Sequence, residues 1–177
     1  MNTIKAYRLI ASAFILCFFS LCGHAAPNYI QLSSFLNQPA STTDNTLATY
    51  DSVNGKYNFD SDKSNVTVNR DGIYFVMVSV QSGAIKADDL TSSGNLDLWI
   101  NINNHAIDFS AVRQTNKAGS INLMITQAIL SLKTGDTVSI GFTADKPGLG
   151  LITFSPSDKK EHQMKISSVN LSMYKLS

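Results

Sequence analysis

The chain has 177 residues and a formal net charge of +1, from 14 basic and 13 acidic residues. This length accommodates one domain of ordinary size together with an export signal. Charged residues make up only 15% of the sequence and form no strongly basic stretch, which argues against nucleic acid as a partner.

The first predicted element is an export signal over residues 1–25. Lys5 and Arg8 precede an apolar run that ends at Leu21, and small residues after it allow cleavage behind Ala25. The run is shorter than the roughly twenty residues that span a bilayer, so no membrane span is expected after signal removal. The domain then covers residues 26–177. A retained membrane anchor is the alternative.

Both cysteines, Cys17 and Cys22, lie within this signal, so the processed chain contains none. It also loses Lys5 and Arg8, and 12 basic against 13 acidic residues give a net charge of −1. An exported chain without disulfides must be stabilised by its core, a metal ion or oligomerisation. The expected location is extracellular, or the periplasm if the chain is bacterial and travels no further.

Strand patterns then follow one another. A first strand is predicted at 29–32, a long polar loop at 37–46, and two alternating strands at 56–59 and 65–68. Asn69-Arg70-Asp71-Gly72 is predicted to be a turn in which Gly72 is free to take a positive φ.

The strand after this turn, Ile73 to Val80, is apolar on both faces. Farther on, residues 96–102 alternate most clearly, with Trp99 on the polar side of the strand. No long amphipathic helix is visible, and eight to ten short strands separated by turns predict a sandwich or barrel. The remaining strands are predicted at 106–109, 121–125, 130–132, 138–142, 149–154 and 169–173.

Two motifs connect this pattern with a known family. Gly72-Ile73-Tyr74 opens an aromatic-containing strand, and residues 130–138 read Leu-x-Leu-x-x-Gly-Asp-x-Val. In both, the sequence resembles the C1q/TNF-like globular domains, over about residues 29–176. The resemblance implies an all-β, ten-stranded jelly-roll sandwich that forms trimers and binds rather than catalyses. The motif residues are Gly72, Tyr74, Leu130, Leu132, Gly135, Asp136 and Val138.

The strand at 73–80 also predicts association. One of its faces can fill the core, but the other must be covered too, because a large exposed apolar patch is unusual on a monomer. In the resembling family this outward face lines the trimer axis. We therefore predict that Phe75 and Met77, together with Leu123 and Ile125, lie between subunits of a homotrimer. A loop of the same chain over this face is the alternative.

Trp99 is a candidate ligand-binding residue. It lies among Asn and Asp on the polar side of its strand, where an indole could stack on a sugar or anchor a protein contact. An aromatic ring packed beneath a neighbouring loop is the alternative.

Candidate chemistry is sparse. His105 and His162 have no second histidine or cysteine at ligand spacing, so no zinc site is expected. Asp60-Ser61-Asp62 begins like a calcium loop but lacks the glycine and glutamate of an EF-hand. Some C1q heads hold calcium, so calcium stays open, and no other cofactor is expected.

The sequence therefore predicts a secreted, non-enzymatic trimer that binds an extracellular protein or carbohydrate. The polar loops near 88–94, 114–120 and 155–163 are candidate contacts. A structural component of an extracellular coat or matrix is the first alternative. A hydrolase is the second, since a Ser-His-Asp triad can form across a fold, although the chain has no Gly-x-Ser-x-Gly elbow.

Overall fold

The computed structural model describes residues 28–55, 58–85, 93–154 and 165–177. The expected export signal, residues 1–25, lies outside this part, so the domain limits stay a prediction. The described residues contain fourteen β-strands and one short 3₁₀ helix, η1 (Asp108–Ser110). Among these residues, no helix has the length and apolar character needed to cross a membrane.

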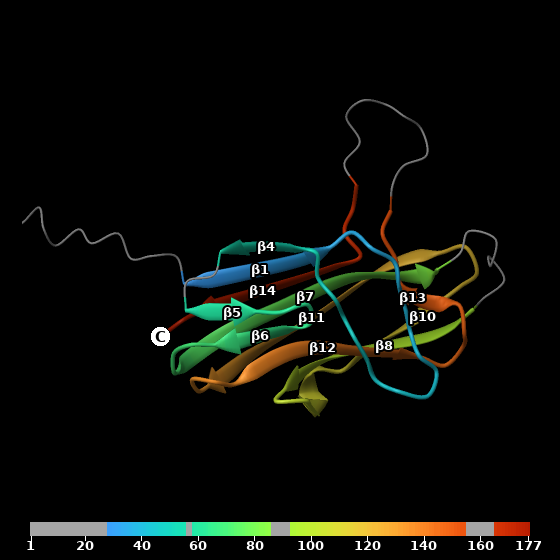
Figure 1. Ribbon diagram of the computed structural model, residues 1–177. Coiled ribbons are helices and arrows are strands. Elements are labelled where there is room, and N and C mark those ends of the chain that lie inside the picture. Colours follow the sequence, from blue (N-terminus) through green and yellow to red (C-terminus); the bar gives the residue numbers. More distant parts are fainter. Residues whose placement is uncertain (1–27, 56–57, 86–92, 155–164) are drawn as a thin grey trace, which may run out of the picture.

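The strands form two antiparallel seven-stranded sheets that pack on each other (Figure 1). The first sheet contains β1 (Tyr29–Ser34), β2 (Gln38–Pro39), β4 (Ser52–Gly55), β7 (Gly72–Ala84), β11 (Ile121–Leu132), β13 (Leu149–Leu151) and β14 (Val169–Lys175). The second contains β3 (Thr46–Leu47), β5 (Phe59–Ser61), β6 (Asn65–Val68), β8 (Gly94–Ile102), β9 (His105–Ala106), β10 (Val112–Asn116) and β12 (Thr137–Ala144). The all-β sandwich is thus confirmed, and short paired segments raise the strand number above ten.

The core lies between the two inner faces, and the period of two in the sequence decides which residues enter it. The inward apolar side chains of β7 and β8 are at most 1% exposed, whereas the residues that alternate with them along each strand mostly face outward. Tyr74 meets Phe59 edge to face, with ring centroids 5.7 Å apart. The inward side chains of these two strands are Tyr74, Val76, Val78, Val80, Leu96, Leu98 and Ile100.

The long strand β7 organises the first sheet. It pairs with β14 and β13 along one edge and with β11 along the other (Figure 1). The β7–β11 register runs without interruption from Gly72 opposite Leu132 to Gly83 opposite Ile121. Residues that face each other in an antiparallel pair lie on the same side of the sheet, so this register also defines the outward face.

Several local predictions need correction. The strand predicted at 106–109 gives way after Ala106 to the helix η1, and the loop predicted at 37–46 contains β2. Gly72 does not have a positive φ but is the first residue of β7, and its requirement for glycine is steric. A Cβ atom there would lie 2.3 Å from the carbonyl oxygen of Ser177 and 2.6 Å from Cε of Lys175. The predicted loop at 114–120 is also shorter, because residues up to Asn116 belong to β10 and pair with β8.

Candidate functional site

The Gly-Asp motif builds one end of the sandwich. Gly135 turns the chain between β11 and β12 with a φ of 91°, a conformation that favours glycine. The Asp136 carboxylate accepts hydrogen bonds from the backbone N–H of Lys133 at 2.8 Å and from Nδ2 of Asn103 at 2.9 Å. Asn103 lies in the β8–β9 turn, so the Asp136 carboxylate joins two hairpins. The hydrogen bond from Asn103, followed by the one from Lys133, lowers the pKa of Asp136.

The other motif residues are structural as well. Leu130, Leu132 and Val138 point into the core and are nearly or completely buried. The Tyr74 hydroxyl donates to the backbone carbonyl of Arg70 across the turn that precedes β7. The motif therefore accounts for the fold rather than for a site.

The outward face of the first sheet carries a group of apolar side chains on β7, β11 and β14, which we call the apolar face. Phe75 lies at its centre, because it is opposite Ile129 on one neighbouring strand and Tyr174 on the other. Leu123, Ile125 and Ile129 are 64%, 52% and 65% exposed, although each is a large aliphatic side chain. The apolar face comprises Ile73, Phe75, Met77, Ile121, Leu123, Ile125, Ile129 and Tyr174.

The four residues predicted at a trimer interface all lie on this face. Phe75 is half-buried and Met77 is exposed, and both point away from the core. Leu123 and Ile125 share the face but lie farther along β7, opposite Gln81 and Ser79. The structure thus brings the four together on one side of one sheet.

Sequence reasoning missed Ile129 and Tyr174. Ile129 precedes the Leu-x-Leu motif, and its alternation with Leu130 indicates that β11, like β7, is apolar on both sides. That signal was available. For Tyr174, only the β7–β14 register shows that it lies beside Phe75.

The outward face of the second sheet is polar and carries Trp99. The indole Nε1 donates to Oδ1 of Asn101 at 2.9 Å, and the ring is partly exposed. It lies over Gly141 of the neighbouring strand β12, where a Cβ atom would be 2.5 Å from Nε1. The ring is therefore partly exposed and packs along one side on the backbone of β12.

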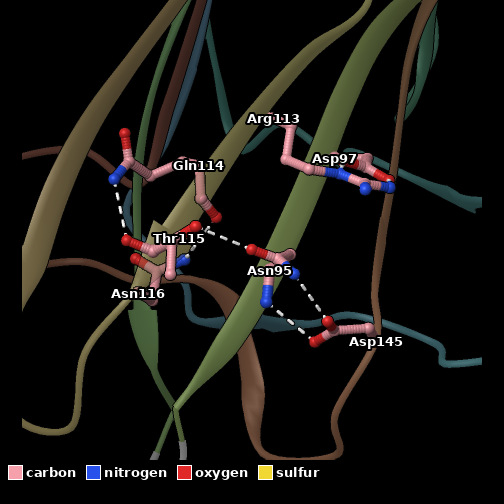
Figure 2. Close-up of polar contacts among 7 residues, drawn as sticks. All are labelled: Asn95, Asp97, Arg113, Gln114, Thr115, Asn116 and Asp145. Carbon is pink, nitrogen blue, oxygen red and sulfur yellow. Dashed lines mark hydrogen bonds and ion pairs between the residues drawn. The ribbon is translucent and has the colours of Figure 1, made fainter.

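A row of polar contacts runs across β8 and β10 (Figure 2). Its Asp97 and Arg113 line the same depression as Trp99, so we call it, together with Trp99, the Trp99 row. Arg113 donates from Nε and Nη2 to the two carboxylate oxygens of Asp97, both at 2.7 Å. These bonds raise the pKa of Arg113. Thr115 Oγ1 donates to Asn95 at 2.7 Å, and Asn95 donates from its backbone N–H and its Nδ2 to Asp145 at 2.7 and 2.8 Å. The backbone bond is the main reason why the pKa of Asp145 is lowered.

The other candidate positions form no site that can be described. His105 is exposed in β9, whereas His162 and the loops 88–92 and 155–163 lie outside the described residues. The Asp62 carboxylate accepts backbone N–H bonds from Ser64 and Asn65, both at 2.7 Å, and so closes a turn. Within the described ranges, no three His, Cys, Asp or Glu residues lie together as metal ligands would.

Comparisons with known proteins rest on structure alone. A scan against protein-family models and a search of the curated proteins find no match. Among solved structures, the globular domain of zebrafish complement 1qA matches with a TM-score of 0.57 and 14% identity, over 85% of this chain and 98% of that chain. Murine APRIL at pH 5.0 matches with a TM-score of 0.53 and 16% identity, over 84% and 98%.

The chain has the C1q/TNF jelly-roll fold. The resemblance inferred from Gly72-Ile73-Tyr74 and from the Gly-Asp hairpin is therefore confirmed at the level of the fold. Within this C1q/TNF jelly roll, the apolar face lies on the outer side of the first sheet, and the Trp99 row lies on the outer side of the second. The two candidate surfaces are on opposite sides of one subunit.

Proposed function

We propose that the processed chain is an exported, non-enzymatic C1q/TNF-like module that forms a homotrimer and binds an extracellular ligand through several copies of one site. The observation that carries this proposal is the apolar face, with Phe75 at its centre. The C1q/TNF resemblance implies a three-fold axis on this side of the molecule. Three copies of a weak site gain avidity when they engage one surface together.

The physical argument is the size and shape of the apolar face. The face extends over three adjacent strands. Contiguous apolar patches that exceed the usual few hundred Å² are rare on a soluble monomer and mark interaction surfaces. Covering about 100 Å² on a side chain such as Ile129 provides about 2.5 kcal/mol. Several such contributions per subunit are comparable with the cost of association, which is about 4–15 kcal/mol.

The decisive experiment replaces Ile129 by aspartate. This side chain is already mostly exposed in the subunit, so Ile129→Asp should leave the fold intact while it introduces a charge at the interface. We expect a trimeric mass for the wild-type processed chain in light scattering and a monomeric mass for the variant. Circular dichroism checks that both are folded.

Val53→Asp is the control, and circular dichroism checks its fold too, because Val53 pairs with the buried Leu32. Val53 is also exposed and apolar, but it lies on β4, at the opposite edge of the first sheet from β11. This variant should remain trimeric. A monomeric wild-type chain, or a trimer that survives Ile129→Asp, would contradict the proposal.

A further inference from the structure

A shallow depression lies on the outer face of the second sheet, between β8 and β10. Its volume is about 300 Å³, and its lining consists of Asp97, Trp99, Ala111, Val112 and Arg113. Small-molecule sites range from about 300 to 1,000 Å³, so this depression has room for a single ring rather than for an extended chain. Its lining combines an aromatic ring with an exposed ion pair.

The aromatic part of the lining is held in place before any ligand arrives. Trp99 uses its N–H on Asn101, and Gly141 lets the ring lie directly on the backbone of β12. The indole therefore presents carbon surface to the depression rather than a free donor. Because the ring is already fixed, stacking of a ligand on it costs little side-chain conformational entropy of Trp99.

The polar part is fixed too, and it retains hydrogen-bonding capacity. A guanidinium has five N–H donors, and Arg113 uses two of them on Asp97. The two side chains are 67% and 28% exposed, so their remaining donors and lone pairs are accessible. A sugar hydroxyl can donate to the carboxylate and accept from the guanidinium at the same time.

The charge of the surroundings narrows the ligand class. Arg113 and Asp97 cancel each other, and Asp145, held by Asn95 in the same row (Figure 2), is balanced by the neighbouring Lys146. These pairs leave no net positive charge that would attract an acidic sugar. A flat, uncharged ring with a carbon face and a rim of hydroxyl groups fits both parts of the lining.

We propose that Asp97, Trp99 and Arg113 form a binding site for an uncharged pyranose ring of a glycan. This site would give the proposed function its ligand class. Only its avidity rests on the proposed trimer. The site itself lies within one subunit and on the opposite sheet from the apolar face. Each copy should therefore bind one sugar ring whether or not the trimer forms.

The first test uses the intrinsic fluorescence of Trp99, the single tryptophan of the chain. Methyl glycosides of neutral hexoses and, separately, of carboxylated sugars are titrated up to about 100 mM, because one shallow site is expected to bind in the millimolar range. We expect a saturable fluorescence change with at least one neutral glycoside and none with the carboxylated ones. Arg113→Ala should weaken binding at least tenfold.

The second test is a glycan array with variants of the ring. Trp99→Ala should reduce binding at least tenfold, and Trp99→Phe should restore most of it, since it keeps an aromatic face. Phe154→Ala is the control, because it removes another exposed aromatic ring outside the lining. Array binding that Trp99→Ala retains would overturn the proposal, as would a preference for acidic glycans or no response to any neutral hexose.

The Ile129→Asp variant separates this inference from the trimer. If the trimer exists, the variant should lose array binding that depends on avidity but keep the fluorescence response to single sugars. A monomeric wild-type chain that still responds to a neutral glycoside refutes the trimer alone. A trimer that responds to none refutes the sugar site alone.

Discussion

At the scale of single residues, two buried tyrosines differ in one hydrogen bond. The side chain of Tyr74 is fully buried, and its hydroxyl donates to the carbonyl of Arg70. The hydroxyl of Tyr50 is buried without a protein partner among the described residues, and burial raises its pKa. A buried polar group without a partner costs about 1–3 kcal/mol, whereas a satisfied one contributes about 1 kcal/mol.

The two tyrosines therefore predict substitutions of opposite sign. Tyr50→Phe removes an unpaired polar group, and the free energy of unfolding should stay the same or rise by about 1 kcal/mol. Tyr74→Phe removes a formed hydrogen bond, and the free energy should fall by about 1 kcal/mol. Urea unfolding of both variants measures the difference. Equal losses in the two variants would show that Tyr50 has a partner of similar strength.

At the scale of elements, aspartate side chains hold the turns. Asp62 closes the turn between β5 and β6, and Asp136 joins two hairpins. Asp71 accepts hydrogen bonds from the backbone N–H and the hydroxyl of Thr134, both at 2.8 Å. In each case these bonds lower the pKa of the carboxyl group from the ordinary value of 3.8.

A lowered native pKa makes stability depend on pH in one direction. The unfolded chain binds protons on these carboxylates at a higher pH than the folded chain, so folding is favoured above the unfolded value and loses that contribution as pH falls. The melting temperature should change little from pH 7 to about 5 and fall steadily below about 4. Thermal unfolding followed by circular dichroism measures this.

Asp136→Asn isolates one of these groups. It should lower the melting temperature at pH 7 and reduce its decline in acid, because the ionised form of the carboxylate no longer contributes. Asp108→Asn is the control, since Asp108 is exposed in η1 and belongs to none of these turns. If the melting temperatures of both variants declined equally little in acid, the acid sensitivity would not come from Asp136.

At the scale of the whole molecule, the two sheets divide two tasks in the proposed assembly. In that proposal, the apolar face on the first sheet would join subunits, and the Trp99 row on the second sheet would stay accessible for a ligand. This division lets three sites share one rigid body without competing for the same surface. Rigid spacing matters because avidity is lost when the sites cannot engage together.

Association of folded subunits also predicts a concentration dependence of stability. Because only the folded chain forms the trimer, mass action should raise the melting temperature of the wild-type chain as its concentration increases. The Ile129→Asp variant should melt at a lower temperature that does not change with concentration. Calorimetry over a hundredfold concentration range tests this, and a concentration-independent wild-type value would contradict a reversible trimer.

Much of this structure could be predicted from sequence because strand alternation is a local property. The inward set of β7 and β8, the hairpin at Asn103-Asn104 and the Gly-Asp turn are all encoded in adjacent residues. The steric role of Gly72 was not predicted. Its constraint comes from the chain terminus near Ser177, which no local pattern reveals.

By itself, the sequence determined which side of each strand is apolar and that β7 is apolar on both, because side chains alternate with a period of two. Only the tertiary structure decided which strands are neighbours. It placed Ile129 and Tyr174 beside Phe75, paired Arg113 with Asp97, and set Gly141 beneath Trp99. Alternation specifies a face but no partner, since the pairing of distant strands depends on the closure of the whole sandwich.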